Sequence, residues 1–314
     1  ISISGVEIPR LITHRSLINH LQKMLPMIAA ETHSPLRHIH RTGNSSSFIL
    51  MPSWSTSPLL PYIGAKLVTH HSGNSAVNLP GVHAVYALFE SLTGRPLAFI
   101  DATELTLYRT ACVSALASSY LSREDSATLV AVGAGALAPH LVKAHLIVRP
   151  NIKRILVWNR THEKAGIMAD NLRKDPQFRG ISVECVSDLE EAVRSGDIIT
   201  CATNSEVALV KGVDLKKGAH LDLVGSFTPA MRECDEEAVR RGRVFVDTEA
   251  AAVEAGELAG AVDVVEGELV DVVKGEKKGR MNSEEITVFK SVGSAMVDLL
   301  AAQIVYENYT QQAI

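Results

Sequence analysis

The sequence lacks the features that direct a chain to a membrane or a nucleic acid. Its 314 residues contain no apolar run long enough to cross a bilayer as a helix, and the first residues show no signal-peptide pattern. The formal net charge is −4, and the longest basic stretch, at residues 274–280, is short. These absences argue against a membrane or nucleic-acid partner, and we expect a soluble intracellular protein.

Cysteine is scarce as well. The four cysteines are far apart and form no C-x-x-C pair, so we expect reduced thiols and no disulfide framework. His38 and His40, and His70 and His71, stand close together, but no cysteine or carboxylate accompanies them at the spacing of a metal site. The sequence therefore predicts no bound metal.

A glycine turn between a strand and a helix is the clearest motif that is present. Residues 128–132 are apolar and β-branched, as in a buried parallel strand, and residues 139–147 are typical of a helix. Between them Gly133, Gly135 and Ala138 form G-x-G-x-x-A. The first glycine permits a tight turn, the second lets the backbone approach a pyrophosphate, and the third small residue lets helix and strand pack closely. The phosphates would bind at the helix N-terminus.

The end of the next strand, residues 155–158, predicts which dinucleotide is bound. A fold that binds NAD carries an acidic residue at this point for the ribose 2′-hydroxyl. This chain has Asn159, Arg160 and Thr161 instead. These side chains suit a 2′-phosphate, since arginine binds phosphate bidentately. We expect NADPH as the cofactor, with NADH as the alternative.

Strands and helices alternate through the second half of the chain. Further strand-like segments recur at residues 181–186, 198–202, 221–224 and 244–246. Such alternation produces a parallel sheet with helices on both faces. We therefore predict an α/β fold with a Rossmann dinucleotide-binding domain over residues 123–285.

The first part of the chain has a different pattern. Thr13 is a candidate N-cap for an amphipathic helix over residues 13–30, and residues 105–121 and 286–309 also have helical spacing. Segments typical of strands lie at residues 45–51, 64–70, 82–89 and 97–100, with a hairpin turn at residues 92–96. We predict an α+β domain over residues 1–122, completed by a C-terminal helix over residues 286–314.

Three cations of this first domain stand among apolar or small residues. They are Arg37, Lys66 and Arg109. Together they could clamp the carboxylate of an amino-acid-sized substrate, because a charge-assisted hydrogen bond contributes about 1.5–3 kcal/mol. Spacing alone leaves open a surface role for each of them.

Several motifs together resemble one known family. They are Pro35-x-Arg37, Met51-Pro52, Gly64-Ala65-Lys66, Thr93-Gly94-x-Pro96, Asp101-Ala102-x-x-Leu105-Thr106-x-x-Arg109-Thr110-Ala111, the Gly133 turn, Trp158-Asn159-Arg160-Thr161, Val224-Gly225 and Val288-Phe289-Lys290-Ser291. This combination spans nearly the whole chain and resembles the ornithine cyclodeaminase/mu-crystallin family. The resemblance implies a substrate-binding and dimerisation domain built from both termini, a Rossmann domain, and a homodimer.

The resemblance also implies roles for individual residues. In the family, the residues that match Arg37, Lys66 and Arg109 grip the substrate carboxylate, and the matching lysine takes part in proton transfer, so we expect these three to be catalytic. Residues that match Thr203, Val224 and Ser291 lie near the nicotinamide. The full set of expected cofactor-binding residues is Gly133, Gly135, Ala136, Leu137, Asn159, Arg160, Thr161, Thr203, Val224, Ser291 and Thr110.

Two departures from the family pattern bear on the reaction. Ornithine cyclodeaminases carry a glutamate where Ile49 stands and an aspartate where Phe227 stands. Release of ammonia with ring closure needs a base or a water-orienting carboxylate, so both replacements argue against cyclodeamination. Reduction of a cyclic imine needs a hydride, a proton and an anchor for the carboxylate. The sequence therefore predicts an NADPH-dependent ketimine reductase, an oxidoreductase acting on CH–NH bonds.

The segments FILMPSWS and NLPGVHAVYALFESLTGRP resemble the plant branch of the family. That resemblance implies reduction of piperideine-2-carboxylate (dehydropipecolate) to pipecolate, in pipecolate biosynthesis and lysine catabolism, and a plastid location, with the cytoplasm as the alternative. Three other functions stay open. They are an ornithine cyclodeaminase that forms proline and ammonia, an amino-acid dehydrogenase of the alanine type, and a non-catalytic crystallin-like protein that binds NADPH and a hormone-like molecule.

Overall fold

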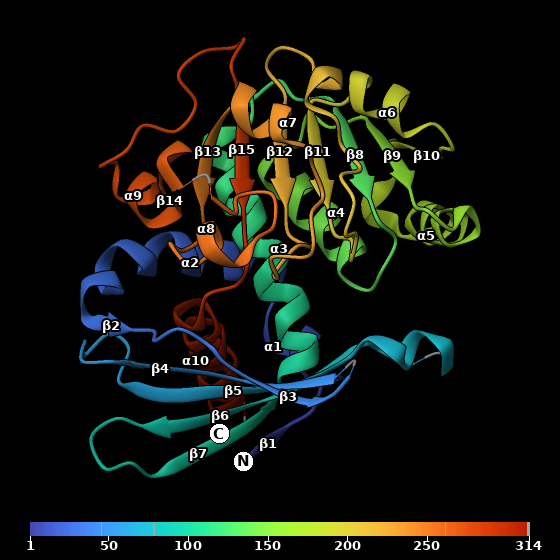
Figure 1. Ribbon diagram of the computed structural model, residues 1–314. Coiled ribbons are helices and arrows are strands. Elements are labelled where there is room, and N and C mark those ends of the chain that lie inside the picture. Colours follow the sequence, from blue (N-terminus) through green and yellow to red (C-terminus); the bar gives the residue numbers. More distant parts are fainter. Residues whose placement is uncertain (45, 78, 261, 313–314) are drawn as a thin grey trace. The chain divides into compact units, whose positions relative to one another are not determined.

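The computed structural model describes residues 1–44, 46–77, 79–260 and 262–312, and the chain divides into two compact units (Figure 1). The first unit comprises Ile1–Arg109 and Ser294–Ile314, and the second comprises Thr110–Gly293. The first division falls inside one continuous helix, α3 (Ala102–Leu121), whereas the sequence pattern placed it after residue 122. Because α3 continues through the division without a break, the local sequence pattern gives no signal for where the first unit ends.

The first unit is built on a seven-stranded sheet in the order β1-β7-β6-β5-β4-β2, with β3 also paired to β4. Neighbouring strands from β4 to β7 are antiparallel, and β1 is parallel to β7. The strands are β1 Ser2–Ile3, β2 Thr32–His33, β3 His38–Gly43, β4 Ser46–Ser55, β5 Tyr62–His71, β6 Val82–Glu90 and β7 Pro96–Asp101. The four predicted strands are confirmed, although Ser45, where the first was predicted to begin, lies outside the described residues.

Helices cover one face of this sheet. They are α10 (Ala295–Gln312), which packs on the sheet, and α1 (Ile8–Leu11) and α2 (His14–Ile28), which pack on α10. Two short 3-10 turns also belong to this unit, η1 (Ala29–Glu31) after α2 and η2 (Ser72–Val77) after β5. The predicted N-cap is confirmed, because the Thr13 hydroxyl accepts a hydrogen bond of 3.1 Å from Ser16 N. Helix α10 packs on β4, β5 and α2. No helix of the described residues is long and apolar enough to cross a membrane.

The opposite face of the sheet is apolar and open to solvent. Side chains alternate between the two faces along each strand, and Trp54, Ile63, Val85 and Phe99 on this face are 38%, 38%, 45% and 55% exposed. Other apolar side chains on it are partly buried. We call this surface the open sheet face; it comprises Phe48, Leu50, Trp54, Ile63, Leu67, Val85, Phe89 and Phe99.

The second unit contains an eight-stranded parallel sheet in the order β10-β9-β8-β11-β12-β15-β13-β14. The strands are β8 Thr128–Val132, β9 Arg154–Trp158, β10 Ser182–Cys185, β11 Ile198–Cys201, β12 His220–Leu223, β13 Gly242–Val246, β14 Val265–Glu268 and β15 Ile286–Lys290. The strand order reverses between β8 and β11. In open α/β sheets, ligands bind beyond the carboxyl ends of the strands at such a reversal.

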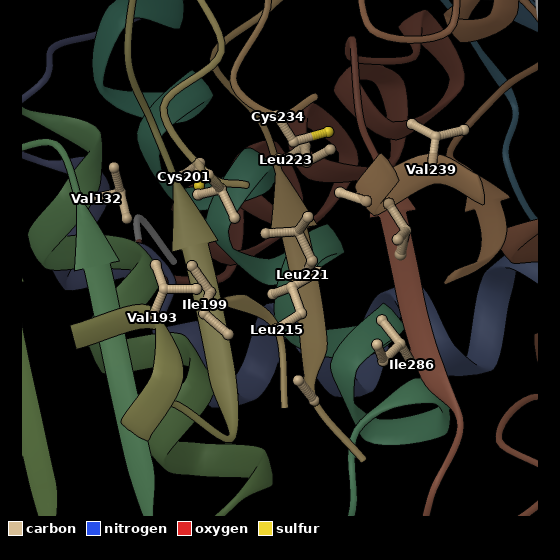
Figure 2. Close-up of a cluster of buried hydrophobic side chains, with 14 of the residues drawn as sticks. Val132, Val193, Ile199, Cys201, Leu215, Leu221, Leu223, Cys234, Val239 and Ile286 are labelled. Carbon is tan, nitrogen blue, oxygen red and sulfur yellow. The ribbon is translucent and has the colours of Figure 1, made fainter. Parts of the chain in front are cut away.

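Helices lie on both faces of the parallel sheet. They are α4 Leu137–Val148, α5 His162–Lys174, α6 Leu189–Ser195, α7 Glu236–Arg241, α8 Ala251–Glu254 and α9 Leu269–Lys274, with 3-10 turns η3 Pro176–Phe178, η4 Gly212–Asp214 and η5 Val262–Val264. Successive residues of β8 enter different cores, since Leu129 packs with α4 and α5 whereas Val130 packs with α6 and α7. Figure 2 shows the second of these cores. The predicted α/β class with a Rossmann-type parallel sheet is confirmed.

The prediction of one helix from residue 286 onward is wrong for its first part. Residues Ile286–Lys290 form β15, a fully buried strand between β12 and β13. The helix begins only at Ala295, after Gly293 with a φ of 90°, and residues 313–314 lie outside the described residues. All five residues of the run ITVFK are buried and the run is short, so periodicity could not separate a buried strand from a buried helix.

A buried arginine fixes the end of α3 within the second unit. Arg149 is 6% exposed, and its guanidinium donates hydrogen bonds of 2.9 Å to the carbonyl oxygens of Ser118 and Ser122 and of 2.8 Å to the Ser122 hydroxyl. The last carbonyl groups of a helix have no partner within the helix. The Ser118 carbonyl oxygen also accepts from Ser122 N within the helix. Arg149 therefore adds a donor there and provides one for the Ser122 carbonyl oxygen at the helix end.

We predict that Arg149→Met lowers the free energy of unfolding by about 3 kcal/mol, because it removes several buried hydrogen bonds from the guanidinium and leaves the Ser122 carbonyl oxygen without that donor. Urea denaturation followed by circular dichroism measures the change. Lys153→Met, at a neighbouring exposed position, is the matched control and should alter stability by less than about 0.5 kcal/mol. Equal stability of the two variants would contradict this role for Arg149.

Candidate active site

Two of the three predicted cations lie against the same carboxylate in the first unit. Lys66 lies in the middle of β5 and Arg109 in α3, and both contact Asp298 of α10. Lys66 Nζ is 2.7 Å from Asp298 Oδ2 and donates a hydrogen bond of 3.0 Å to Oδ1. Arg109 Nε is 2.9 Å from Asp298 Oδ1. A strand and two helices that are distant in sequence thus bring three charges together.

All three charged side chains are buried. Lys66, Arg109 and Asp298 are 3%, 6% and 1% exposed. Burial, followed by the positive charge of Arg109, lowers the pKa of Lys66 to about 7, although Asp298 acts in the opposite direction. Lys66 can therefore gain or lose a proton near neutral pH, which an exposed lysine cannot do.

Arg37 lies in the segment between β2 and β3 and is half-buried. Its charge contributes to lowering the pKa of Lys66, so it belongs to the same electrostatic environment. The structure places Arg37, Lys66 and Arg109 within one unit. Their function as a carboxylate clamp stays a prediction.

Asp298 was missed by the sequence analysis. Its neighbours in α10, including Val297, Leu299 and Leu300, are apolar and buried, so the segment was read only as a packing helix. An acid among these apolar neighbours was the available signal, because a carboxylate is rarely buried without a cationic partner.

A tyrosine and a serine lie beside this cluster. Tyr86 is the cross-strand partner of Lys66 and is fully buried, and its hydroxyl is 3.4 Å from Ser53 Oγ. Burial raises the pKa of Tyr86 above its usual range. Gly64 leaves room for this ring, since a Cβ at that position would lie 2.2 Å from the Tyr86 hydroxyl oxygen. Tyr86 is therefore a neutral hydroxyl group beside the charged cluster.

The two positions that depart from the cyclodeaminase pattern are apolar in the structure also. Ile49 is 7% exposed on β4, two residues from Met51, which is the cross-strand partner of Lys66. Phe227 packs against the core of the second unit. Neither position offers a carboxylate.

The glycine turn has the geometry expected of a dinucleotide site. Gly133 has a φ of 108°, and a Cβ there would lie 2.6 Å from the carbonyl oxygen of Ala202, so no other residue fits. A Cβ on Gly135 would meet no atom within 4 Å. No protein neighbour thus requires that glycine, and the space beside it is open to a pyrophosphate.

Helix α4 begins directly after this turn. Ala136 is its N-cap and makes no side-chain cap, and Leu137 is its first residue. Uncapped N–H groups at a helix N-terminus favour a bound phosphate. An open pocket of about 260 Å³ lies beside the turn and is lined by Gly135, Ala136 and, from α5, Lys164.

Of the three residues that follow β9, Asn159 contacts the glycine turn and the other two are exposed. Asn159 Oδ1 accepts a hydrogen bond of 3.2 Å from Ala134 N, and its Nδ2 donates one of 2.9 Å to the Thr161 carbonyl oxygen. Asn159 therefore joins the two loops. Arg160 and Thr161 are exposed, and contact between Arg160 and a 2′-phosphate stays a prediction.

Three of the remaining predicted cofactor residues follow the carboxyl ends of parallel strands: Thr203 follows β11, Val224 follows β12 and Ser291 follows β15. The fourth, Thr110, is buried in α3. Glu233 ties two of these ends together: its Oε1 accepts from Thr203 N at 2.7 Å and its Oε2 from Gly225 N, next to Val224, at 2.7 Å. Asp247 holds the third, since its Oδ2 accepts from the Ser291 hydroxyl at 2.7 Å. Neither carboxylate was identified from the sequence.

Comparison with known proteins agrees with this geometry. The model of the ornithine cyclodeaminase/mu-crystallin family matches residues 5–313. The chain is 52% identical over 314 residues to Protein SAR DEFICIENT 4 of Arabidopsis thaliana, which covers 98% of this chain and 97% of that protein. It is 40% identical over 278 residues to a Delta(1)-pyrroline-2-carboxylate reductase of Colwellia psychrerythraea, with 85% of each chain covered.

A solved structure is also similar over the full length. Delta(1)-pyrroline-2-carboxylate reductase of Thermococcus litoralis, in complex with NADH and L-proline, superposes with a TM-score of 0.93 at 29% identity and covers 100% of this chain and 98% of that one. From the family model and these relatives together, the chain belongs to the ornithine cyclodeaminase/mu-crystallin family.

Proposed function

We propose that this protein is an NADPH-dependent ketimine reductase that converts piperideine-2-carboxylate to pipecolate. At a coarser level it is an NAD(P)H-dependent oxidoreductase that reduces a cyclic imine. Two similar proteins are pyrroline-2-carboxylate reductases by name, and one of them was solved with NADH and L-proline, a cyclic amino acid. The six-membered ring rests on the resemblance to plant sequences, and so do pipecolate formation, lysine catabolism and a plastid location.

The buried pair Lys66 and Arg109 is the observation that supports this function best. When Lys66 is protonated, Asp298 neutralises one of the two positive charges, so the three side chains keep a net positive charge in the interior. A substrate carboxylate would neutralise the remaining positive charge. Arg109 contacts Asp298 through Nε, and a guanidinium group carries further N–H donors in a planar arrangement that fits a second carboxylate.

Lys66 supports the proton part of the reaction. Reduction of a C=N bond adds a hydride to carbon and a proton to nitrogen, and NADPH supplies the hydride when it is bound. A lysine whose pKa is lowered to about 7 can donate a proton near neutral pH and recover it from solvent. The apolar Ile49 leaves no glutamate beside Lys66 to activate a water, which disfavours cyclodeamination.

We assign the cofactor to the second unit. Gly133, Gly135 and the N-terminus of α4 would hold the pyrophosphate, and Thr203, Val224 and Ser291 would lie near the nicotinamide. Arg160 would bind the 2′-phosphate, because residues 159–161 contain no carboxylate that would repel it. Lys164, which lines the pocket beside the turn, adds a second positive charge near this position.

We also propose that the protein is a homodimer through the open sheet face. A contiguous apolar surface is uncommon on a monomer and marks an interaction site. Leu50, Leu67 and Val85 are neighbours across three adjacent strands, so the apolar surface is continuous. A second copy of the same surface would bury it in a self-complementary interface.

The first prediction concerns the reaction itself. Piperideine-2-carboxylate should support NADPH oxidation, followed at 340 nm, at higher kcat/KM than pyrroline-2-carboxylate or pyruvate with ammonia, and ornithine should release no ammonia. Arg109→Met should raise KM for the ketimine by about tenfold to a hundredfold, because one charge-assisted contact is lost. Its affinity for NADPH, measured by fluorescence, should stay within about twofold.

Two results would reject this assignment. Ammonia release from ornithine without net NADPH oxidation would indicate a cyclodeaminase. Wild-type kinetics in Arg109→Met would exclude the clamp.

The second prediction concerns the cofactor. Arg160→Ala should lower kcat/KM for NADPH by about tenfold or more and leave kcat/KM for NADH within about twofold, since only NADPH carries the 2′-phosphate. Arg179→Ala, another exposed arginine of the same unit, is the matched control. An equal loss with both cofactors would show that Arg160 does not read the 2′-phosphate.

The third prediction concerns assembly. Phe99→Glu places a charge in the open sheet face and should convert the dimer to a monomer in size-exclusion chromatography with light scattering. Leu92→Glu, in the turn between β6 and β7 and 88% exposed, should leave the dimer intact. A monomeric wild-type protein, or a dimeric Phe99→Glu variant, would place the interface elsewhere.

A further inference from the structure

Asp298 occupies a position that packing alone does not explain. It is a carboxylate, 1% exposed, in a buried stretch of α10, where Val297, Leu299 and Leu300 are also buried. Removing a charge from water is costly, and a buried ion pair is often no more stable than apolar side chains of the same size. A helix that served only to cover the sheet would be expected to carry an apolar residue here.

The contacts of Asp298 indicate what the carboxylate does. One oxygen, Oδ1, lies 3.0 Å from Lys66 Nζ and 2.9 Å from Arg109 Nε, and the other lies 2.7 Å from Lys66 Nζ. One anion therefore fixes the positions of two cations that would otherwise repel each other. Without it, two positive charges would be buried side by side.

We propose that Asp298 is a positioning residue for the reaction, which holds Lys66 and Arg109 beside each other and keeps Lys66 in its protonated form until the substrate binds. This rests on the proposed function. The Lys66 ammonium then gives its proton to the ring nitrogen of the ketimine as hydride is added to the ring carbon. The C=N bond is reduced, the nicotinamide is oxidised, and the neutral amine of Lys66 takes a new proton from solvent.

The charged and titratable groups around Lys66 determine the direction in which the pKa of Lys66 shifts. Arg109 from α3 and Arg37, before β3, lower the pKa of Lys66, as burial does, and Asp298 from α10 raises it. Tyr86 on β6 is the cross-strand partner and is neutral. Removing the charge of Asp298 should therefore lower the pKa of Lys66 further. An activity that needs the ammonium form is full below that pKa and is lost as the pH rises through it.

The test is Asp298→Asn, which keeps the shape of the side chain and removes its charge. The alkaline limb of the kcat/KM profile should move down by at least about one pH unit, which makes the variant about tenfold slower than the wild type at pH 8. At the lowest pH at which the enzyme is active, the two rates should lie much closer. A residue with only a structural role would lower activity by the same factor at every pH.

A second readout does not depend on catalysis. The titration of the Lys66 side chain can be followed by NMR in protein labelled with ¹⁵N-lysine, without substrate, after assignment with Lys66→Met. Its midpoint should be lower in Asp298→Asn than in the wild type, and Asp298→Glu, which keeps the charge, should restore it. If Asp298→Asn does not fold, Asp298→Ser leaves room for a water and makes the same comparison.

Gln303→Leu is the matched control. Gln303 is also buried on α10, but its side chain donates to the Leu59 carbonyl oxygen at 3.0 Å. This variant should leave the Lys66 midpoint and the pH profile unchanged. An unchanged midpoint in Asp298→Asn would overturn the proposal for Asp298. If the wild-type protein reduces no ketimine but the Lys66 midpoint is still lower in Asp298→Asn than in the wild type, the proposed function and the catalytic part of this inference are overturned. Only the electrostatic role of Asp298 then stands.

Discussion

The contact of one buried carboxylate with two buried cations organises the first unit. Lys66 comes from the sheet, Arg109 from α3 and Asp298 from the C-terminal helix, so segments from both ends of the chain must meet before any of the three charges is paired. A buried charge without a partner is strongly destabilising. The segments that must meet to pair these charges are therefore also the segments that build the candidate active site. Change at any one of the three positions must affect the folding of the unit and its chemistry together.

The second unit fixes its loops by the same means. Its parallel strands end in short loops, and loops of this kind carry the ligand in α/β sheets. Glu233 accepts hydrogen bonds from the loops after β11 and β12, and Asp247 does so from the loop after β15. Gly225 permits the first of these contacts, because a Cβ there would lie 2.0 Å from the Thr203 carbonyl oxygen. The expected nicotinamide residues are thus held in place by carboxylates rather than by apolar packing.

Much of this could be predicted from the sequence, and the failures have identifiable physical causes. The strand before the glycine turn was predictable because it is a short apolar run that ends at a glycine, and the helix after Thr13 because it has a helical period and an N-cap. The strand Ile286–Lys290 was read as helix because a fully buried strand has no alternation. Asp298 and Glu233 were missed for another reason. Their partners lie far away in the sequence, so no local pattern contains the interaction.

Ile49 and Asp298 together favour reduction over cyclodeamination. Residue 49 lies two residues from Met51, the cross-strand partner of Lys66, so an acid at this position would stand diagonally across from the lysine. Ile49 keeps that side apolar, and the carboxylate that touches Lys66 instead comes from α10 and also contacts Arg109. Both oxygens of this carboxylate lie against a cation, Oδ1 against Lys66 and Arg109 and Oδ2 against Lys66. The arrangement is therefore better suited to keeping a proton on Lys66 than to removing one from water, and a reductase needs the former.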